Sequence, residues 1–191
     1  MEEFLNYINK INPIEEVALQ ELLKHFKPQQ LNKKDFFVKQ GVYANQIGFL
    51  KKGVMRAYFL NENGKEYNKQ FFVGPSIIGA YSSLLTKQPN LIAQQALTDC
   101  EILVADFSKI ESLFDKSHNL ERLGRKIAEF YFLEKEQKEI EMALLDADKR
   151  YLIMKKRFPT IESLIPQYYI ASYLGISPTQ LSRIRKKMST S

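Results

Sequence analysis

The sequence predicts an α+β fold in three consecutive parts: a β-roll of the jelly-roll type, a long helix and a C-terminal pair of short helices. Between residues 29 and 107, short runs of aromatic and β-branched residues alternate with turn signals, as in a small all-β domain. Residues 119–145 contain no proline and a single glycine, which favours one uninterrupted helix. We therefore expect three segments, 1–118, 119–145 and 146–191.

Composition indicates a globular protein and excludes several kinds of site. Hydrophobic residues make up 45% of the 191 residues and charged residues 26%, which is ordinary for a folded domain. Cys100 is the only cysteine, so an internal disulfide and a multi-cysteine metal or iron–sulfur site are excluded. The acidic N-terminus does not resemble a signal peptide, and no long apolar stretch is present. We expect a cytoplasmic protein without a membrane partner.

Two short helices are expected before the β-roll. Asn12-Pro13-Ile14-Glu15 has an N-cap residue, a proline at the first helical position and an acid at the third, which predicts a capping box. Apolar residues follow at helical spacing, and Pro28 is expected to end the run. These apolar residues are Val17, Leu19, Leu22, Leu23 and Phe26.

Six or more short strands are expected in the β-roll. The candidate strands are DFFVKQG, QIGFLKKG, VMRAYFL, KQFFVG, LIAQQAL and EILVADF. Asn63-Gly64 lies between two of these runs and predicts a β-hairpin. After the last strand, Ile110, Leu113 and Phe114 predict a short helix.

The long helix would span about 40 Å. Leu120, Leu123, Ile127 and Phe130 follow a 3-4-3 spacing, as in a coiled-coil seam, and Tyr131 adjoins them. The run Phe130-Tyr131-Phe132-Leu133 makes the helix apolar all round, so more than one side must be covered. We expect a homodimer through Leu120, Leu123, Ile127, Phe130 and Tyr131, the alternative being that the chain buries the whole helix itself.

Positive charge is concentrated at the C-terminal end. Residues 149–191 contain nine Lys/Arg and one acid, a net charge of +8, which leaves −2 for residues 1–148. A basic segment on a nearly neutral body is typical of a module that binds a polyanion. A solvated charged tail is the alternative that charge alone leaves open.

Residues 167–186, QYYIASYLGISPTQLSRIRK, have the pattern of a helix-turn-helix. Small Ala171 would allow a close helix crossing, and Gly175 can adopt the positive φ of the turn. Ser177, Pro178 and Gln180 form an S-x-x-Q capping box for the second helix. The apolar positions expected in its core are Ile170, Leu174, Ile176, Leu181 and Ile184.

The exposed flank of the second helix carries side chains suited to double-stranded DNA. Arg183 could donate two hydrogen bonds to guanine, and Gln180 could pair with adenine. Ser177 and the helix start could hold a phosphate, as could Arg185, Lys186 and Lys187. The predicted DNA-binding residues are Ser177, Pro178, Thr179, Gln180, Ser182, Arg183, Arg185, Lys186 and Lys187.

The chain resembles the Crp–Fnr family of transcriptional regulators over nearly its whole length. The resemblance rests on the glycine-punctuated strands of residues 39–74, on SIIGAYSSLL, on ALTDCEILVADFSKIESLF, and on YYIASYLGISPTQLSRIRKKM. It implies a cyclic-nucleotide-binding-like β-roll and a homodimer joined along residues 119–145. Two recognition helices would then enter successive major grooves, about 34 Å apart, of a near-palindromic operator. RNA polymerase is a further candidate partner.

The sequence departs from family members that bind cyclic AMP. Those proteins hold the phosphate with a glycine–glutamate pair and an arginine–serine pair; here these positions fall on Gly79-Ala80 and near Asn90-Leu91. Without the arginine, nothing neutralises the phosphate, so we expect no useful binding of cyclic AMP. The N-terminal cysteines of oxygen-sensing members are missing, and His25 and His118 are expected to be ordinary surface histidines. No cofactor is expected.

A pocket for another effector remains open, the alternative being a region that packs on the long helix and binds nothing. Its candidate residues are Gly79, Ala80, Tyr81, Ser82, Ser83, Asn90, Gln94 and Gln95. Residues 158–166 leave little room for the strand pair that usually precedes the helix-turn-helix. No catalytic motif is recognised, so we expect a DNA-binding regulator and not an enzyme. A dimerising or sensing module whose helix-turn-helix contacts protein is the alternative.

Overall fold

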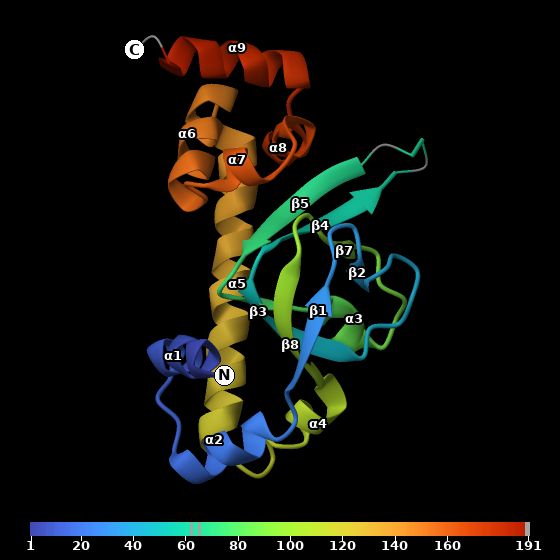
Figure 1. Ribbon diagram of the computed structural model, residues 1–191, viewed down its shortest axis with the longest axis vertical. Helices are drawn as coiled ribbons and strands as arrows, with labels where there is room; N and C mark the ends of the chain where they lie inside the picture. The colour runs from blue at the N-terminus through green and yellow to red at the C-terminus, as the bar shows by residue number, and fades with distance from the viewer. Residues whose placement is uncertain (62, 65, 190–191) are drawn as a thin grey trace.

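The computed structural model describes residues 1–61, 63–64 and 66–189, and it confirms the predicted α+β fold (Figure 1). A β-roll lies beside one long helix, and short helices gather at the C-terminal end of that helix. The helices are α1 (Glu2–Ile11), α2 (Glu16–Leu23), α3 (Tyr81–Thr86), α4 (Phe107–Glu111), α5 (His118–Leu144), α6 (Ala147–Arg157), α7 (Ile161–Leu164), α8 (Gln167–Leu174) and α9 (Pro178–Ser189). The strands are β1 (Lys27–Leu31), β2 (Phe36–Val38), β3 (Gln46–Lys52), β4 (Val54–Leu60), β5 (Glu66–Val73), β6 (Ser76–Ile78), β7 (Ala93–Ala96) and β8 (Cys100–Asp106).

The strands form two antiparallel sheets that enclose the interior of the roll. Sheet A has the order β1-β8-β3-β6, and sheet B has the order β2-β7-β4-β5. Side chains alternate between the two faces of a strand, so neighbours in sequence enter different cores. Leu50 and Phe72 belong to the interior of the roll, whereas Phe49 and Phe71 belong to the cores on the outer faces.

Different helices cover the two outer faces of the roll. On sheet A, Phe49 and Leu103 pack with α1, α2 and the beginning of α5, where Leu120 and Leu123 are buried. On sheet B, Val54 and Phe71 share a core with the C-terminal helices. The predicted segment 146–191 therefore packs directly on the β-roll, and the last two residues of that segment lie outside the described residues.

The predicted capping box before α2 is wrong. Helix α2 begins at Glu16, and its N-cap residue Glu15 makes no side-chain capping bond. Asn12 is buried, and its amide donates to the carbonyl oxygens of Pro13 (3.1 Å) and Asn119 (3.5 Å). The side chain thus joins the α1–α2 connection to α5, a contact between distant residues that local sequence does not show. Val17, which was expected on the apolar face, is exposed.

Two strands were not predicted. Four of the five residues of β1 are exposed, and β6 has only three residues, so neither gives an apolar or alternating pattern. Pro28 was expected to end a helical run, but it lies inside β1. Because β1 is an edge strand of sheet A, the missing N–H of the proline is tolerated there.

The predicted hairpin between β4 and β5 is confirmed. Leu60 pairs with Glu66 across a connection that contains Asn63-Gly64, and Gly64 adopts a φ of 72°. Further along, Ala57 pairs with Gln70 but Tyr58 pairs with Asn68. Lys69 is therefore an extra residue in β5, and such a β-bulge bends the strand and changes where its side chains point.

Helix α5 has the predicted position and length, with 27 residues from His118 to Leu144. Its interior glycine has a packing reason, because a Cβ atom on Gly124 would lie 2.8 Å from Cζ of Phe114. Neither α5 nor any other helix within the described ranges is both long and apolar enough to cross a lipid bilayer. After α5, residues 158–166 hold the short helix α7.

Candidate nucleic-acid interface

Helices α8 and α9 pack around a small buried core, which confirms four of the five predicted core positions, and Ile176 is half-buried against it. Ile170 and Leu174 of α8 and Leu181 and Ile184 of α9 are all buried. Ala171 is buried in the same cluster, so the small side chain occupies the crossing of the two helices.

The turn between the helices depends on Gly175. This residue caps α8 with a φ of 68°, a conformation that a residue with a Cβ adopts at a cost. A Cβ at this position would also lie 2.7 Å from Cε of Met142 on α5. The N–H of Ile176 donates to the carbonyl oxygen of Ala171 (3.0 Å), which closes the turn.

Helix α9 begins at Pro178, as predicted, and Ser177 caps it. The Ser177 hydroxyl oxygen accepts a hydrogen bond from the N–H of Gln180 (3.1 Å). The return bond of the predicted capping box, from the Ser177 N–H to the Gln180 side chain, is absent from the described contacts. The Gln180 amide therefore lies on the surface, where it is exposed.

Helix α9 is the outermost element at its end of the molecule (Figure 1). Most of the residues predicted to bind DNA are exposed on it, and Arg185 is half-buried. The Arg183 side chain makes no hydrogen bond or ion pair with any described residue, so its guanidinium is available to a ligand. The exposed set is Ser177, Pro178, Thr179, Gln180, Ser182, Arg183, Lys186 and Lys187.

Arg185 and Lys187 of α9 have acidic partners in their own chain. Arg185 forms an ion pair with Glu162 of α7 (Nε to Oε1, 3.1 Å), and Glu162 also accepts a hydrogen bond from the Tyr151 hydroxyl (3.1 Å). Lys187 forms an ion pair with Asp148 of α6 (2.6 Å). A phosphate would have to compete with these carboxylates for Arg185 and Lys187.

Polar side chains of α5 and α6 hold Tyr173 of the helix-turn-helix. The Lys138 ammonium donates to the carbonyl oxygen of Tyr173 (3.1 Å) and lies 3.4 Å from the centre of its ring. Arg157 bonds both Glu141 (2.7 Å) and the Tyr173 hydroxyl (3.1 Å). Burial lowers the pKa of Lys138 to about 8.

These contacts of Lys138 and Glu141 were not predicted, although helical spacing places both residues on the buried face of α5. Lys138 lies five helical turns after the buried Leu120 and therefore on the same face of α5. Glu141 follows on that face and is also buried.

The predicted dimer seam needs a correction. Leu120 and Leu123 are buried in their own chain against α1, α2 and sheet A, and Ile127 is half-buried against the same cluster. The Tyr131 hydroxyl donates to the carbonyl oxygen of Ile77 and accepts from its N–H (both 3.0 Å). Of the predicted seam, only Phe130 is exposed, because the N-terminal helices and β6 cover the other four positions.

A second apolar row on α5 is left uncovered by the chain. Phe130, Leu133, Ile140 and Leu144 are 50%, 60%, 46% and 78% exposed. With Gln137 they follow a 3-4-3-4 spacing, which places all five on one stripe of the helix. The pattern was visible in the sequence, but the sequence could not show which of two apolar stripes the chain itself would bury.

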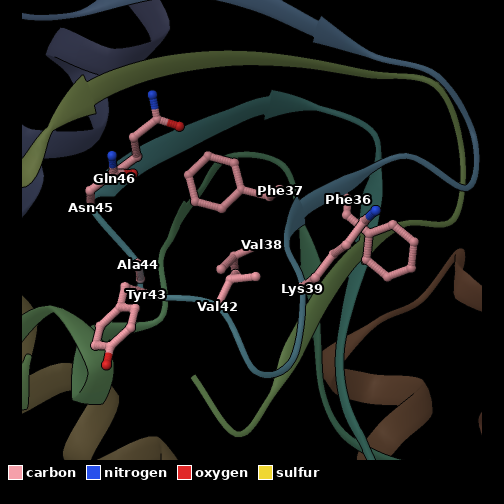
Figure 2. Close-up of a pocket in the computed structure, with 9 residues that line it drawn as sticks. All are labelled: Phe36, Phe37, Val38, Lys39, Val42, Tyr43, Ala44, Asn45 and Gln46. Carbon is pink, nitrogen blue, oxygen red and sulfur yellow. The ribbon is translucent and has the colours of Figure 1, made fainter. Parts of the chain in front are cut away.

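The β-roll contains a cavity of about 230 Å³ (Figure 2). The Phe37 ring projects into it, whereas the Lys39 ammonium turns toward Phe36, 5.5 Å from the centre of that ring. The lining residues are Phe36, Phe37, Val38, Lys39, Val42, Tyr43, Ala44, Asn45 and Gln46. None of them was predicted as an effector contact, because the link between β2 and β3 carries no recognisable motif.

None of the predicted effector residues is among those that line this cavity. Ser83 accepts from the N–H of Ala44 (3.1 Å), and Asn90 exchanges backbone hydrogen bonds with Gly41 and Val42 (2.7 Å each). Both residues thus hold the loop that lines the cavity. Tyr81 and Ser82 are exposed on α3.

Gln94 and Gln95 point to opposite faces of β7. Gln94 is buried, its amide donates to the carbonyl oxygen of Gly79 (2.9 Å), and its Oε1 has no partner among the described residues. Gln95 bonds Arg56 and the carbonyl oxygen of Lys34 on the outside of sheet B. The structure therefore separates Gln95 from the other effector candidates.

The positions that correspond to the phosphate-binding pairs carry no positive charge. Ala80 is the N-cap residue of α3, and the Asn90 amide bonds the backbone of Ile92. In the described part of the chain, no group of three or more His, Cys, Asp or Glu side chains is arranged to bind a metal.

Comparisons with known proteins agree with this architecture. Residues 28–117 match the model of the cyclic nucleotide-binding domain. FixK2 from Bradyrhizobium japonicum has a TM-score of 0.74 at 16% identity, over 86% of this chain and 85% of its own. The c-di-GMP responsive global regulator CLP of Xanthomonas campestris has a TM-score of 0.70 at 14% identity, over 92% of each chain.

A Eubacterium rectale protein assigned to the Crp/Fnr family of transcriptional regulators has a TM-score of 0.70 at 13% identity, over 93% of this chain and 84% of its own. No curated protein sequence matches the chain. The structural matches extend beyond the β-roll, because they cover most of both chains. Residues 28–117 are thus similar to the cyclic nucleotide-binding domain, and the chain as a whole has the fold seen in these regulators.

Proposed function

We propose that this chain is a sequence-specific DNA-binding transcriptional regulator that works as a homodimer and catalyses no reaction. The observation that carries the proposal is the capped helix α9, whose basic flank is exposed above a buried helix-turn-helix core. The Crp/Fnr fold supports the same role. Residues 1–118 would then be the sensor domain, residues 119–145 the dimerisation helix and residues 146–191 the DNA-binding domain.

The predicted DNA-binding residues have different proposed roles. Arg183 and Gln180 are exposed at positions from which they can reach base edges, where arginine suits guanine and glutamine suits adenine. Ser177, Thr179, Ser182 and Lys186 would contact the phosphate backbone, and Lys187 would do so in competition with Asp148. Arg185 is held by Glu162, so we assign it mainly to fixing α9 on α7.

The exposed row on α5 supports dimerisation with a second copy of this chain. Phe130, Leu133, Ile140 and Leu144 are large and about half or more exposed, and their heptad spacing fits an identical helix across a two-fold axis. Gln137 lies in the middle of the row, where a polar residue can fix the register of two helices. A dimer on this row would present two copies of α9 at the same end.

The β-roll supports a sensor that does not respond to cyclic AMP. The phosphate of that ligand would meet Ala80 and Asn90 and no cation. The cavity of about 230 Å³ has a largely apolar and aromatic lining, which instead favours an uncharged effector. RNA polymerase remains a candidate partner of the DNA-bound dimer.

Selection of bound duplexes from a random pool tests the proposal. We expect a near-palindrome with half-sites about one helical turn apart. Affinity for that operator should fall steeply with salt, because phosphate contacts release counterions. A dimer that ignores duplex DNA at low ionic strength, or binds it without sequence preference, would refute the proposal and favour a role in protein contacts.

Arg183→Ala sharpens the test at one base pair. We expect the preference at that position to relax at a cost of about 1–3 kcal/mol, while the other positions keep theirs. Lys109→Ala is the matched control, because Lys109 is an exposed cation on α4 at the other end of the molecule. Unchanged sequence preference in Arg183→Ala would remove this residue from base recognition.

A further inference from the structure

Arg56 is a buried charge that lies outside the proposed DNA-binding, dimerisation and effector sites. It lies on β4, is 2% exposed, and points to the outer face of sheet B rather than into the roll. Its pairing partner on β7 is Gln95, which is also on the outer face. Burying an arginine is costly unless every donor finds a partner, so the arrangement around it needs a reason.

All five N–H donors of the guanidinium are used. Nε and Nη2 donate to Oε1 of Gln95 (3.1 and 2.8 Å), and Nη1 donates to Oδ1 of Asn68 (3.3 Å). Both Nη atoms bond the carboxylate of Glu66, so this ion pair is bidentate. Such a planar fork fixes the orientation of the guanidinium as well as its position.

Part of this site comes from the helix-turn-helix. The guanidinium carbon lies 3.6 Å from the ring centre of Tyr58 on β4 and 4.2 Å from that of Tyr169 on α8. A guanidinium against an aromatic ring is attractive and geometrically specific. Arg56 therefore binds α8, the helix that supports α9, to the β4–β5 hairpin.

The partners of Arg56 also bind the backbone of α8. The Asn68 amide donates to the carbonyl oxygen of Tyr169 (3.2 Å), and the Asn68 N–H donates to the Ser172 hydroxyl (3.0 Å). That hydroxyl in turn donates to the carbonyl oxygen of Glu66 (3.2 Å). Strand β5 is an edge strand of sheet B, so Ser172 satisfies backbone groups that would otherwise be unpaired.

Apolar contacts continue the same attachment along β5. The Phe71 ring lies 4.8 Å from that of Tyr173 on α8 and 6.1 Å from that of Phe158. The β-bulge at Lys69 separates this apolar part from the polar part around Asn68. Figure 1 shows β5 passing beside α8.

We propose that Arg56 is a positioning residue for DNA binding, which holds α8, and through it α9, at a fixed orientation on the β-roll of the same subunit. The proposal rests on the proposed function. In a dimer, each recognition helix would then be tied both to α5 and to its own roll. The distance and angle between the two recognition helices would be set by two attachments, which gives the dimer a strict preference for one half-site spacing.

Variants of α8 test this proposal, because they leave the hydrogen bonds of Arg56 to Gln95, Asn68 and Glu66 in place. Tyr169→Leu removes the ring beside the guanidinium, and Ser172→Ala removes the bonds to the edge of β5. We combine the two changes and compare them with Tyr169→Phe, which keeps the ring. The duplexes carry the selected half-sites at the optimal spacing and with one or two base pairs inserted.

Wild type and Tyr169→Phe should each lose roughly tenfold or more in affinity when one base pair is inserted, because the insertion rotates one half-site by about a tenth of a turn. The double variant should lose less than about threefold, while its affinity for a single half-site stays within about twofold of wild type. Retention of the full spacing preference by the double variant would overturn the proposal. A purely structural role would lower affinity for every spacing alike and also contradict it.

A DNA-free measurement separates this proposal from the proposed function. Spin labels at Lys33→Cys in the roll and Ser189→Cys in α9, in a Cys100→Ala background, report the distance within one subunit when labelled chains are diluted with unlabelled ones. A narrow distribution is expected in wild type and a broad one in the double variant. If wild type fails to bind DNA, the proposed function fails, yet a broadened distribution still supports the attachment and an unchanged one refutes it.

Discussion

The two halves of α5 look similar in sequence, but they are held in different ways. The first half is fixed by apolar side chains of its own chain, with Leu120 and Leu123 buried under α1 and α2. The second half touches its own chain mainly through polar groups, with Lys138 and Glu141 buried beneath α8 and α6. The apolar side chains of this second half, by contrast, face outward; they are Phe130, Leu133, Ile140 and Leu144.

This difference indicates that the two halves of α5 have different roles. Apolar burial tolerates small shifts in angle, whereas hydrogen bonds and ion pairs require one geometry. The first half therefore contributes stability to the fold. The second half orients the helix-turn-helix on one side and offers Phe130, Leu133, Ile140 and Leu144 to a second copy on the other.

The largest effect is expected in the first half. Leu120→Ala should lower the free energy of unfolding by about 2–5 kcal/mol, because it leaves a cavity among well-packed side chains. Chemical denaturation at fixed protein concentration measures the loss, and sedimentation shows whether the dimer persists. A variant of normal stability that becomes monomeric would place Leu120 in the dimer interface and reverse the comparison.

The second half should respond in the opposite way. Leu133→Glu places a charge in the proposed seam, so the dimer dissociation constant should rise at least about 100-fold, or about 2.7 kcal/mol. The unfolding free energy of the monomer should stay within about 0.5 kcal/mol, because the side chain is exposed in the chain itself. Sedimentation equilibrium measures the first quantity and denaturation of the dilute protein the second.

Phe132→Glu is the matched control for that variant. Phe132 is 61% exposed on the same helix but lies about a third of a turn from the centre of the row. It should leave dimerisation within about twofold of wild type. Equal effects of the two substitutions would show that general apolar exposure, and not this row, drives association.

The helix-turn-helix could be predicted residue by residue because its requirements are local. Gly175 must adopt a positive φ, Ser177 must cap α9, and the core positions follow from helical spacing within 20 residues. Each rule acts over one or two helical turns, so tertiary contacts did not override it. The strands from β2 to β5 were recognisable for a similar reason, since each has its own apolar run.

Features that depend on distant segments were mispredicted or not predicted. Asn12 looked like a helix cap but bonds Asn119, and Leu120 and Leu123 looked like a dimer seam but are covered by α1 and α2. Gln95 looked like a neighbour of Gln94 in a pocket, although strand alternation places it on the other face, beside Arg56. The burial of Arg56 was not predicted, because a single arginine in a strand gives no sign that it is buried.

The smallest effect is expected from the polar support of the second half, and it depends on pH. Burial lowers the pKa of Lys138 to about 8, whereas an unfolded lysine has its ordinary value of 10.5. Between these values the unfolded chain binds the proton and the folded chain does not, so stability rises as pH increases through this range. Relative to Lys138→Met, wild type should gain about 1 kcal/mol between pH 8 and pH 9. Urea denaturation at both pH values measures the difference, and a flat or falling difference would mean that Lys138 is charged without penalty beneath α8.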